Sequence, residues 1–116
     1  MTIERINVGP RLSDVAAYNK VAYFAGQVPD DVDEDITGQT RQVLAGIDKL
    51  LAQVGSDKSR ILQCHISLTD IANIRAMNEV WDAWIPKGNT PPRATVQAQL
   101  ANPKWKIEIV LSAAAG

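Results

Sequence analysis

The chain is poor in the residue types on which several kinds of site depend. Its 116 residues include one cysteine and one histidine. The single cysteine, Cys64, excludes an internal disulfide. His65, the single histidine, cannot form a two-histidine acid–base pair or a histidine-rich metal site within one chain. We therefore expect no metal centre, and we expect His65 to play a local structural role.

Excess charge of one sign and long apolar runs are also missing. The formal net charge is -1, and no cluster of lysine or arginine forms a basic stripe, so nucleic acid is not an expected partner. No apolar run approaches the roughly 20 residues that span a bilayer, which argues against a membrane partner. The start, residues 1–5, lacks the basic and apolar segments of a signal peptide. These features predict a cytoplasmic protein.

The pattern of apolar residues predicts a single α+β domain over residues 1–116, with 46% hydrophobic residues to form its core. Apolar residues recur at helical spacing over 35–54, and Gly55 stands where a helix commonly ends. A second helix is expected between Asp70, which can cap it, and Pro86. Alternating runs predict strands near 2–7, 14–19, 21–26, 60–68, 91–96 and 106–110, with a turn at 18–20.

Two details of these elements bear on chemistry. In the strand at 60–68, strict alternation places Leu62 and Cys64 on one face and Ile61 and His65 on the other. Cys64 then points away from His65, and we expect it to pack as a small hydrophobe. On the second helix, we expect Trp81 and Trp84 to pack within the protein and not to form a platform for stacking nucleic-acid bases.

The last quarter of the chain holds the strongest candidate site. A turn at Asn102-Pro103 separates the strand that begins at Arg93 from the strand that contains Glu108, which predicts a hairpin of the two. A guanidinium can bind a carboxylate through two hydrogen bonds, and a carboxylate can orient or deprotonate water. From spacing alone, the pair is either a site for a small acid or a surface ion pair.

The last strand also predicts an interface. Its two faces carry Trp105, Ile107, Ile109 and Leu111 on one side and Lys106, Glu108, Val110 and Ser112 on the other, so neither face is wholly polar. Two helices can cover only one face of the sheet. Exposed apolar sheet of this extent usually marks a contact with another molecule.

Five segments of the chain form an ordered pattern at characteristic spacing: 21–29, 55–62, 77–81, 92–93 and 106–109. Taken together, they resemble the RidA/YjgF family, most closely its short YoaB-like branch with an Asn-Pro turn before the last strand. The resemblance implies a chorismate-mutase-like/YjgF fold, with a mixed sheet of about six strands and two helices on one face. It also implies a homotrimer whose reactive sites lie in clefts between subunits.

RidA-like deaminases hydrolyse reactive 2-enamino and 2-imino acids, such as 2-aminoacrylate and 2-iminopropionate, to the 2-keto acid and ammonia. By resemblance, Arg93 matches the arginine that holds the substrate carboxylate, and Glu108 matches the glutamate that positions the attacking water. Gly26 and Gln27 would form part of the wall, although Gly26 equally fits a simple strand-end turn. An imine carbon is already electrophilic, so no metal or organic cofactor is expected.

Three positions depart from the best-characterised deaminase pattern. Arg11 stands where the family commonly has tyrosine, Ala25 where it has serine, and Thr95 where it often has cysteine. Thr95 can still offer a hydroxyl group to a ligand. Arg11 is either a second contact for a larger or dicarboxylic anion or a solvated loop arginine.

Three classes of function therefore stay open. Hydrolytic deamination leads, and binding or sensing of a small carboxylate such as a 2-keto acid in the same cleft is the alternative. Family members have also been labelled endoribonucleases or translation inhibitors. That third class fits poorly with a net charge of -1 and one histidine.

Overall fold

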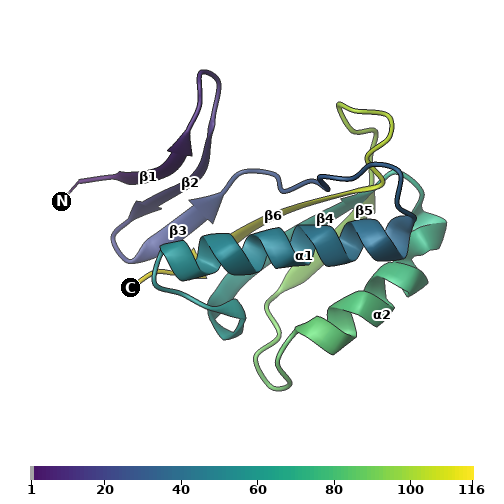
Figure 1. The fold of residues 1–116 in the computed structure, drawn as a ribbon. Coiled ribbons are helices and arrows are strands. Elements are labelled where there is room, and N and C mark those ends of the chain that lie inside the picture. The colour runs from purple at the N-terminus through teal and green to yellow at the C-terminus, as the bar shows by residue number, and fades with distance from the viewer. Residues whose placement is uncertain (1) are drawn as a thin grey trace.

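The computed structural model describes residues 2–116, which form a six-stranded sheet with two helices packed on one face (Figure 1). This arrangement confirms the predicted α+β fold. Within the described residues, neither helix is long and apolar enough to cross a membrane. The strands are β1 (Glu4–Val8), β2 (Ser13–Tyr18), β3 (Val21–Phe24), β4 (Ile61–Leu68), β5 (Arg93–Gln97) and β6 (Ile107–Ala114), and the helices are α1 (Ile36–Gln53) and α2 (Ile74–Trp84).

The first three strands form an antiparallel meander at one end of the sheet. The turn between β2 and β3 consists of Asn19 and Lys20, whose φ angles of 53° and 64° lie in the left-handed region. Two successive residues of this kind produce the tight turn whose twist matches that of the flanking strands. The predicted turn at 18–20 is therefore confirmed.

Helix α1 begins and ends where local signals predict, whereas α2 begins at Ile74, after a 3-10 turn that separates it from the expected cap Asp70. Asp35 caps α1, since its side chain accepts a hydrogen bond of 2.9 Å from the Gly38 N–H. Gly55 follows the helix with a φ of 69°, a conformation that costs glycine little. Asp70 caps a short 3-10 turn (Ile71–Asn73) that leads into α2. The buried stripe of α1 consists of Ile36, Val43, Leu44, Ile47, Leu50 and Leu51.

The predicted hairpin of β5 and β6 is wrong. The strand order is β1-β2-β3-β6-β4-β5, so β4 lies between the two. β5 pairs with β4 in parallel, and β6 pairs with the other edge of β4 in antiparallel orientation. The long connection through the turn at Asn102-Pro103 thus crosses over β4 instead of folding back on β5.

Ile61 and Leu62 do not point to the faces of the sheet that strict alternation predicts. A bulge in β4 between Ile61 and Gln63 leaves Leu62 as an extra residue, so Ile61 is buried and Leu62 is 47% exposed. A bulge of this kind shifts the alternation of every residue before it. On β6, by contrast, alternation holds as predicted: Ile109 lies in the core, and Val110 faces away from the helices.

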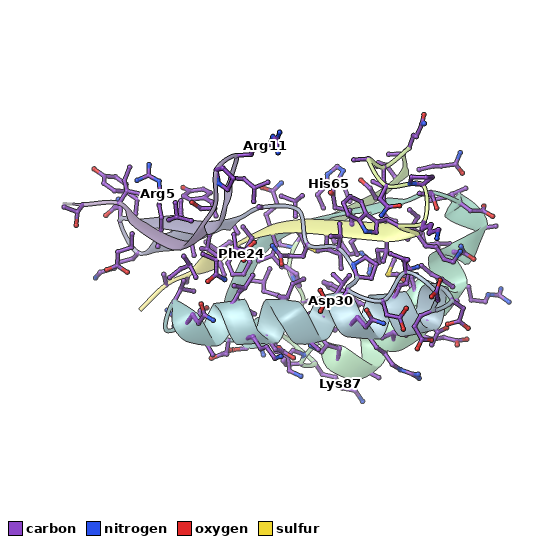
Figure 2. The ribbon with its side chains drawn as sticks, turned by 45° about the horizontal axis from the view of Figure 1, so that its top comes forward. Arg5, Arg11, Phe24, Asp30, His65 and Lys87 are labelled. Carbon is purple, nitrogen blue, oxygen red and sulfur yellow. The ribbon has the colours of Figure 1, made fainter. Side chains whose placement is uncertain are left out.

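The face of the sheet away from the helices carries several exposed apolar side chains among polar ones, as predicted. Tyr23 on β3 and Val110 on β6 are 57% and 40% exposed, and with Gln63, His65 and Ser112 they line a shallow groove. Val96 on β5 adds a further exposed apolar side chain. We call this surface the open face; Figure 2 shows His65 on it, on the side opposite α1.

Candidate functional site

Arg93 lies at the start of the edge strand β5 and points to the helix side of the sheet. Its parallel register places it beside Cys64, which faces the helices. The guanidinium carbon lies 5.0 Å from the centre of the Trp81 ring on α2. Its Nη2 donates a hydrogen bond of 2.8 Å to Oδ1 of Asn78, one turn earlier on the same helix. Helix α2 therefore holds the guanidinium from two sides.

Both groups that hold Arg93 are neutral. Among residues 2–116, the bond to Asn78 is the only side-chain hydrogen bond of this guanidinium. Arginine has five N–H donors in a rigid fork, so most of them stay available to a ligand. The half-buried cation therefore has the chemistry of an anion-binding group.

Thr95 lies two residues after Arg93 on the same face of β5, opposite Ile66. Its Oγ1 is buried and has no hydrogen-bond partner within the described part of the chain. Within one chain, the hydroxyl that Thr95 is expected to offer to a ligand is therefore covered and not open to solvent. A buried hydroxyl without a partner costs about 1–3 kcal/mol.

Cys64 is an unreactive core residue in this arrangement. Burial raises the pKa of its thiol from 9.0 to about 12, although the nearby charge of Arg93 acts in the opposite direction. The thiolate is the nucleophilic form of cysteine, and at neutral pH it is almost absent here. The predicted packing role is consistent with its 1% exposure.

Glu108 belongs to a second group of residues on the open face. It alternates on β6 with the buried Ile107 and Ile109, and its direct neighbour on β4 is Ser67. Its carboxyl group lies directly against Gly26, where an added Cβ would be 2.6 Å from Cδ and from Oε2 of Glu108. Gly26 has no positive φ, so the need for glycine here comes from this contact.

Gln27 follows Gly26 and connects the end of β3 to β6. Its main chain exchanges two hydrogen bonds with Ile109, of 2.7 and 3.0 Å. Its side-chain amide donates to the main-chain oxygen of Ala25 at 2.9 Å. Gly26 therefore lies beside Glu108, whereas Gln27 is paired with Ile109, whose side chain is buried in the core, so Gln27 does not share the face of Glu108.

A single chain does not bring Arg93 and Glu108 together. Arg93 is level with Cys64, whereas Glu108 is level with Ser67, three residues further along β4 and on the other face. The two Cα positions are separated by roughly 10 Å along the strands and roughly 10 Å across them. A small acid cannot contact both side chains within one chain.

Arg11 lies apart from both groups. Figure 2 shows it at the tip of the turn between β1 and β2, where it is exposed. That turn belongs to one end of the sheet, and Arg93 belongs to the edge strand at the other end. Within one chain, Arg11 is a solvated loop arginine.

Comparison with known proteins assigns the chain to a family. The model of the family described as Endoribonuclease L-PSP matches residues 2–115. A relative from Escherichia coli K12, the RutC family protein YoaB, is 48% identical over 98% of this chain and 99% of its own length. The chain belongs to the RidA/YjgF family. A RutC family protein from Haemophilus ducreyi is 54% identical over 97% of this chain and 96% of its own.

A solved structure and a more distant relative extend the comparison. The crystal structure of a YjgF family member from Neisseria meningitidis superposes with a TM-score of 0.97 at 41% identity, covering 100% of this chain and 97% of that one. The chloroplastic Reactive Intermediate Deaminase A of Arabidopsis thaliana is 31% identical over 88% of this chain and 57% of its own length. The YjgF fold predicted from the resemblance is confirmed.

Sequence reasoning missed two residues that contact Arg93 and one buried amide elsewhere in the fold. Asn78 and Trp81 contact Arg93, but only the parallel pairing of β5 makes this visible. Gln39 is fully buried on α1, where its Nε2 donates to three main-chain oxygens and its Oε1 accepts from the Lys106 N–H at 2.8 Å. A glutamine inside a predicted apolar stripe was the available signal, because buried amides require partners. Among residues 2–116, no group of acidic, histidine and cysteine side chains is arranged to hold a metal.

Proposed function

We propose that this RidA/YjgF protein hydrolyses 2-imino and 2-enamino acids, such as 2-iminopropionate and 2-aminoacrylate, to the 2-keto acid and ammonia. The family membership and the name of the Arabidopsis relative support this class of reaction. The observation that carries the proposal is Arg93, a half-buried cation that is held by neutral groups and keeps most of its donors for an anion.

Arg93 holds the substrate carboxylate. Two parallel N–H···O bonds fix the acid end of the substrate and place its C=N carbon at a constant position. The positive charge also compensates the desolvation of the carboxylate. Thr95, beside Arg93, contributes its hydroxyl only if ligand binding or assembly gives that group a partner.

Glu108 positions and activates one water molecule. The water oxygen bonds to the C=N carbon while the π electrons move to nitrogen, and Glu108 transfers the proton from water to that nitrogen. Glu108 then moves the hydroxyl proton of the resulting amino alcohol to its amino nitrogen. The C–N bond breaks with its electron pair leaving on ammonia, and the oxygen becomes the keto oxygen. An enamino acid enters the same sequence after tautomerisation to the imine.

The complete site is formed between subunits of a homotrimer. Arg93 and Glu108 face opposite sides of the sheet within a chain, so each site combines Arg93 of one subunit with Glu108 of its neighbour. Covering the open face in the assembly would also remove the exposed Tyr23 and Val110 from water. Val110→Glu should break the trimer, as seen by analytical ultracentrifugation; a fully active monomer would contradict this arrangement.

A coupled assay tests the activity. Freshly generated 2-iminopropionate is supplied, and ammonia release is compared between the wild type and its variants. Arg93→Ala should lose at least about 100-fold in kcat/KM, and Arg93→Lys should recover little, because a point charge lacks the paired geometry. Glu108→Gln should lower kcat much more than it weakens pyruvate binding. Near-normal turnover by Arg93→Ala would exclude the proposed role.

Binding without turnover is the second candidate. The Arg93 group contains an anion-binding cation, and its neighbour Cys64 stays protonated at neutral pH because burial raises the pKa of the thiol to about 12. Pyruvate binding without ammonia release would favour this candidate. RNA cleavage has less support, because the chain carries a net charge of -1 and a single histidine.

A further inference from the structure

Helix α2 supplies the immediate surroundings of Arg93. Asn78 and Trp81 lie three residues apart and therefore share one side of the helix, where both reach the same guanidinium. Trp81 is itself fixed, since it is 5% exposed and its ring packs at 5.5 Å and 52° against Trp84. Trp84 is anchored in turn by a 2.9 Å hydrogen bond from its Nε1 to Oδ2 of Asp48 on α1. The surface under Arg93 is thus rigid.

Both contacts attract the guanidinium without supplying a negative charge. An aromatic ring attracts a cation through its quadrupole, and the amide oxygen of Asn78 accepts one hydrogen bond from the guanidinium. Neither group carries a formal charge, so neither neutralises arginine. An aspartate or glutamate at position 78 would hold the guanidinium more strongly, but it would also supply the anion that a ligand must otherwise provide.

We propose that Asn78 and Trp81 are positioning residues that orient Arg93 while leaving its charge uncompensated for a ligand carboxylate. This inference rests on the proposed function, because it assigns these residues to the anion-binding half of that site. It explains why a neutral amide, and not a carboxylate, contacts a half-buried arginine. Both residues act through Arg93 and do not touch the reacting atoms.

The Asn78→Asp variant distinguishes a positioning role of Asn78 from a purely structural one. The change is nearly isosteric and keeps the oxygen that accepts from Nη2, so the fold should be as stable as the wild type or more stable. The added charge pairs with Arg93 and should weaken pyruvate binding at least about tenfold at pH 7, the size expected for one charged hydrogen bond. If Asn78 were only structural, pyruvate affinity would be unchanged.

Asn78→Ala and Trp81→Phe test orientation. Asn78→Ala removes the hydrogen bond and should raise KM about tenfold with a smaller change in kcat, since the carboxylate is held in both the ground state and the transition state. Trp81→Phe keeps an apolar ring but weakens the cation–π contact, so we expect a loss of a few-fold. Trp105→Phe is the matched control, because Trp105 precedes β6 and lies outside α2, the helix that holds the guanidinium; it should leave KM unchanged.

An NMR measurement decides the inference independently of turnover. The Arg93 Nε–Hε signal, assigned by its loss in Arg93→Lys, should be shifted by the ring current of Trp81 and should broaden or move in Asn78→Ala. Unchanged signals in Asn78→Ala and Trp81→Phe, or unchanged pyruvate affinity in Asn78→Asp, would overturn the inference. If the wild type binds pyruvate but releases no ammonia, the deaminase proposal fails while the positioning role stands. Wild-type protein that does not bind pyruvate would contradict both.

Discussion

Gly26→Ala should reduce activity while leaving the fold almost as stable. The added Cβ would be 2.6 Å from Cδ and Oε2 of Glu108, whereas ordinary van der Waals contacts begin near 3.4 Å. The carboxyl group must therefore move by about 1 Å, and a misplacement of that size can cost roughly 100-fold in rate. The obstructing atoms belong to the end of a flexible side chain, so rotating it costs only about 0.5–1.5 kcal/mol.

The change in stability should be small because two effects oppose each other. Gly26 has no positive φ, so alanine adopts its backbone conformation without strain and gains about 0.4–1 kcal/mol by restricting the unfolded chain. The net change should stay within about 1 kcal/mol. Urea unfolding and the ammonia-release assay measure the two quantities on the same preparation.

Gly46→Ala is the matched control for this prediction. Gly46 lies within α1, and a Cβ there would meet no atom within 4 Å. Alanine is the better helix former, so this variant should gain about 1 kcal/mol and keep wild-type kcat and KM. If Gly26→Ala retained kcat/KM within about twofold, the placement of Glu108 as the water-positioning group would be refuted.

Three further predictions concern buried groups outside the Glu108 contact. Gln39→Met should lower the free energy of unfolding by about 3–5 kcal/mol, because it leaves the Lys106 N–H and main-chain oxygens without partners. Urea unfolding measures this loss. The same substitution at exposed Gln53 should change the free energy of unfolding by no more than about 0.5 kcal/mol. Thr95→Val should stabilise by about 1 kcal/mol, because it removes a buried hydroxyl without a partner, and destabilisation would mean that assembly supplies one. In the folded protein the pKa of the Cys64 thiol is about 12, above its ordinary value of 9.0. The thiol of the unfolded chain therefore loses its proton at lower pH, and the free energy of unfolding should fall as the pH rises from 9 toward 12. The loss should be about 1.4 kcal/mol at pH 10. Cys64→Ala should abolish this alkaline slope, and an equal slope in the variant would assign it to other groups.

Local signals were sufficient for most of the elements. The buried stripe of α1, its cap at Asp35 and the left-handed Gly55 depend on residues within one or two turns of each other. The tight turn at Asn19 and Lys20 is equally local. Helix α1 and this turn depend on short segments of sequence, and the structure contains both within one or two residues of their predicted bounds.

Pairing between distant strands could not be predicted in the same way. The turn residues at Asn102-Pro103 suggest a hairpin, yet they are equally compatible with a crossover, because parallel pairing leaves no short-range signal. The bulge near Leu62 similarly depends on its partner strand β6. The family resemblance correctly indicated the fold, whereas the assumption that β5 and β6 are neighbours misplaced Arg93 relative to Glu108.

The sequence likewise indicates some features of the candidate site but not the contacts between its residues. The sequence indicates Arg93 and Glu108 as groups suited to a small acid, and it places Gly26 and Gln27 near a strand end. It does not reveal that Glu108 packs on Gly26, or that Asn78 and Trp81 hold Arg93, since these contacts join residues far apart in the chain. Strand register decides which side chains share a face.

Complementation between two inactive variants tests the shared site most directly. Arg93→Ala and Glu108→Gln are each inactive in the ammonia-release assay by this account, but in co-expressed mixed trimers some sites receive an intact arginine from one subunit and an intact glutamate from its neighbour. Random assembly of equal amounts should restore about a quarter of the wild-type activity per site. Mixed trimers that form but stay as inactive as either variant alone would contradict a site built from two subunits.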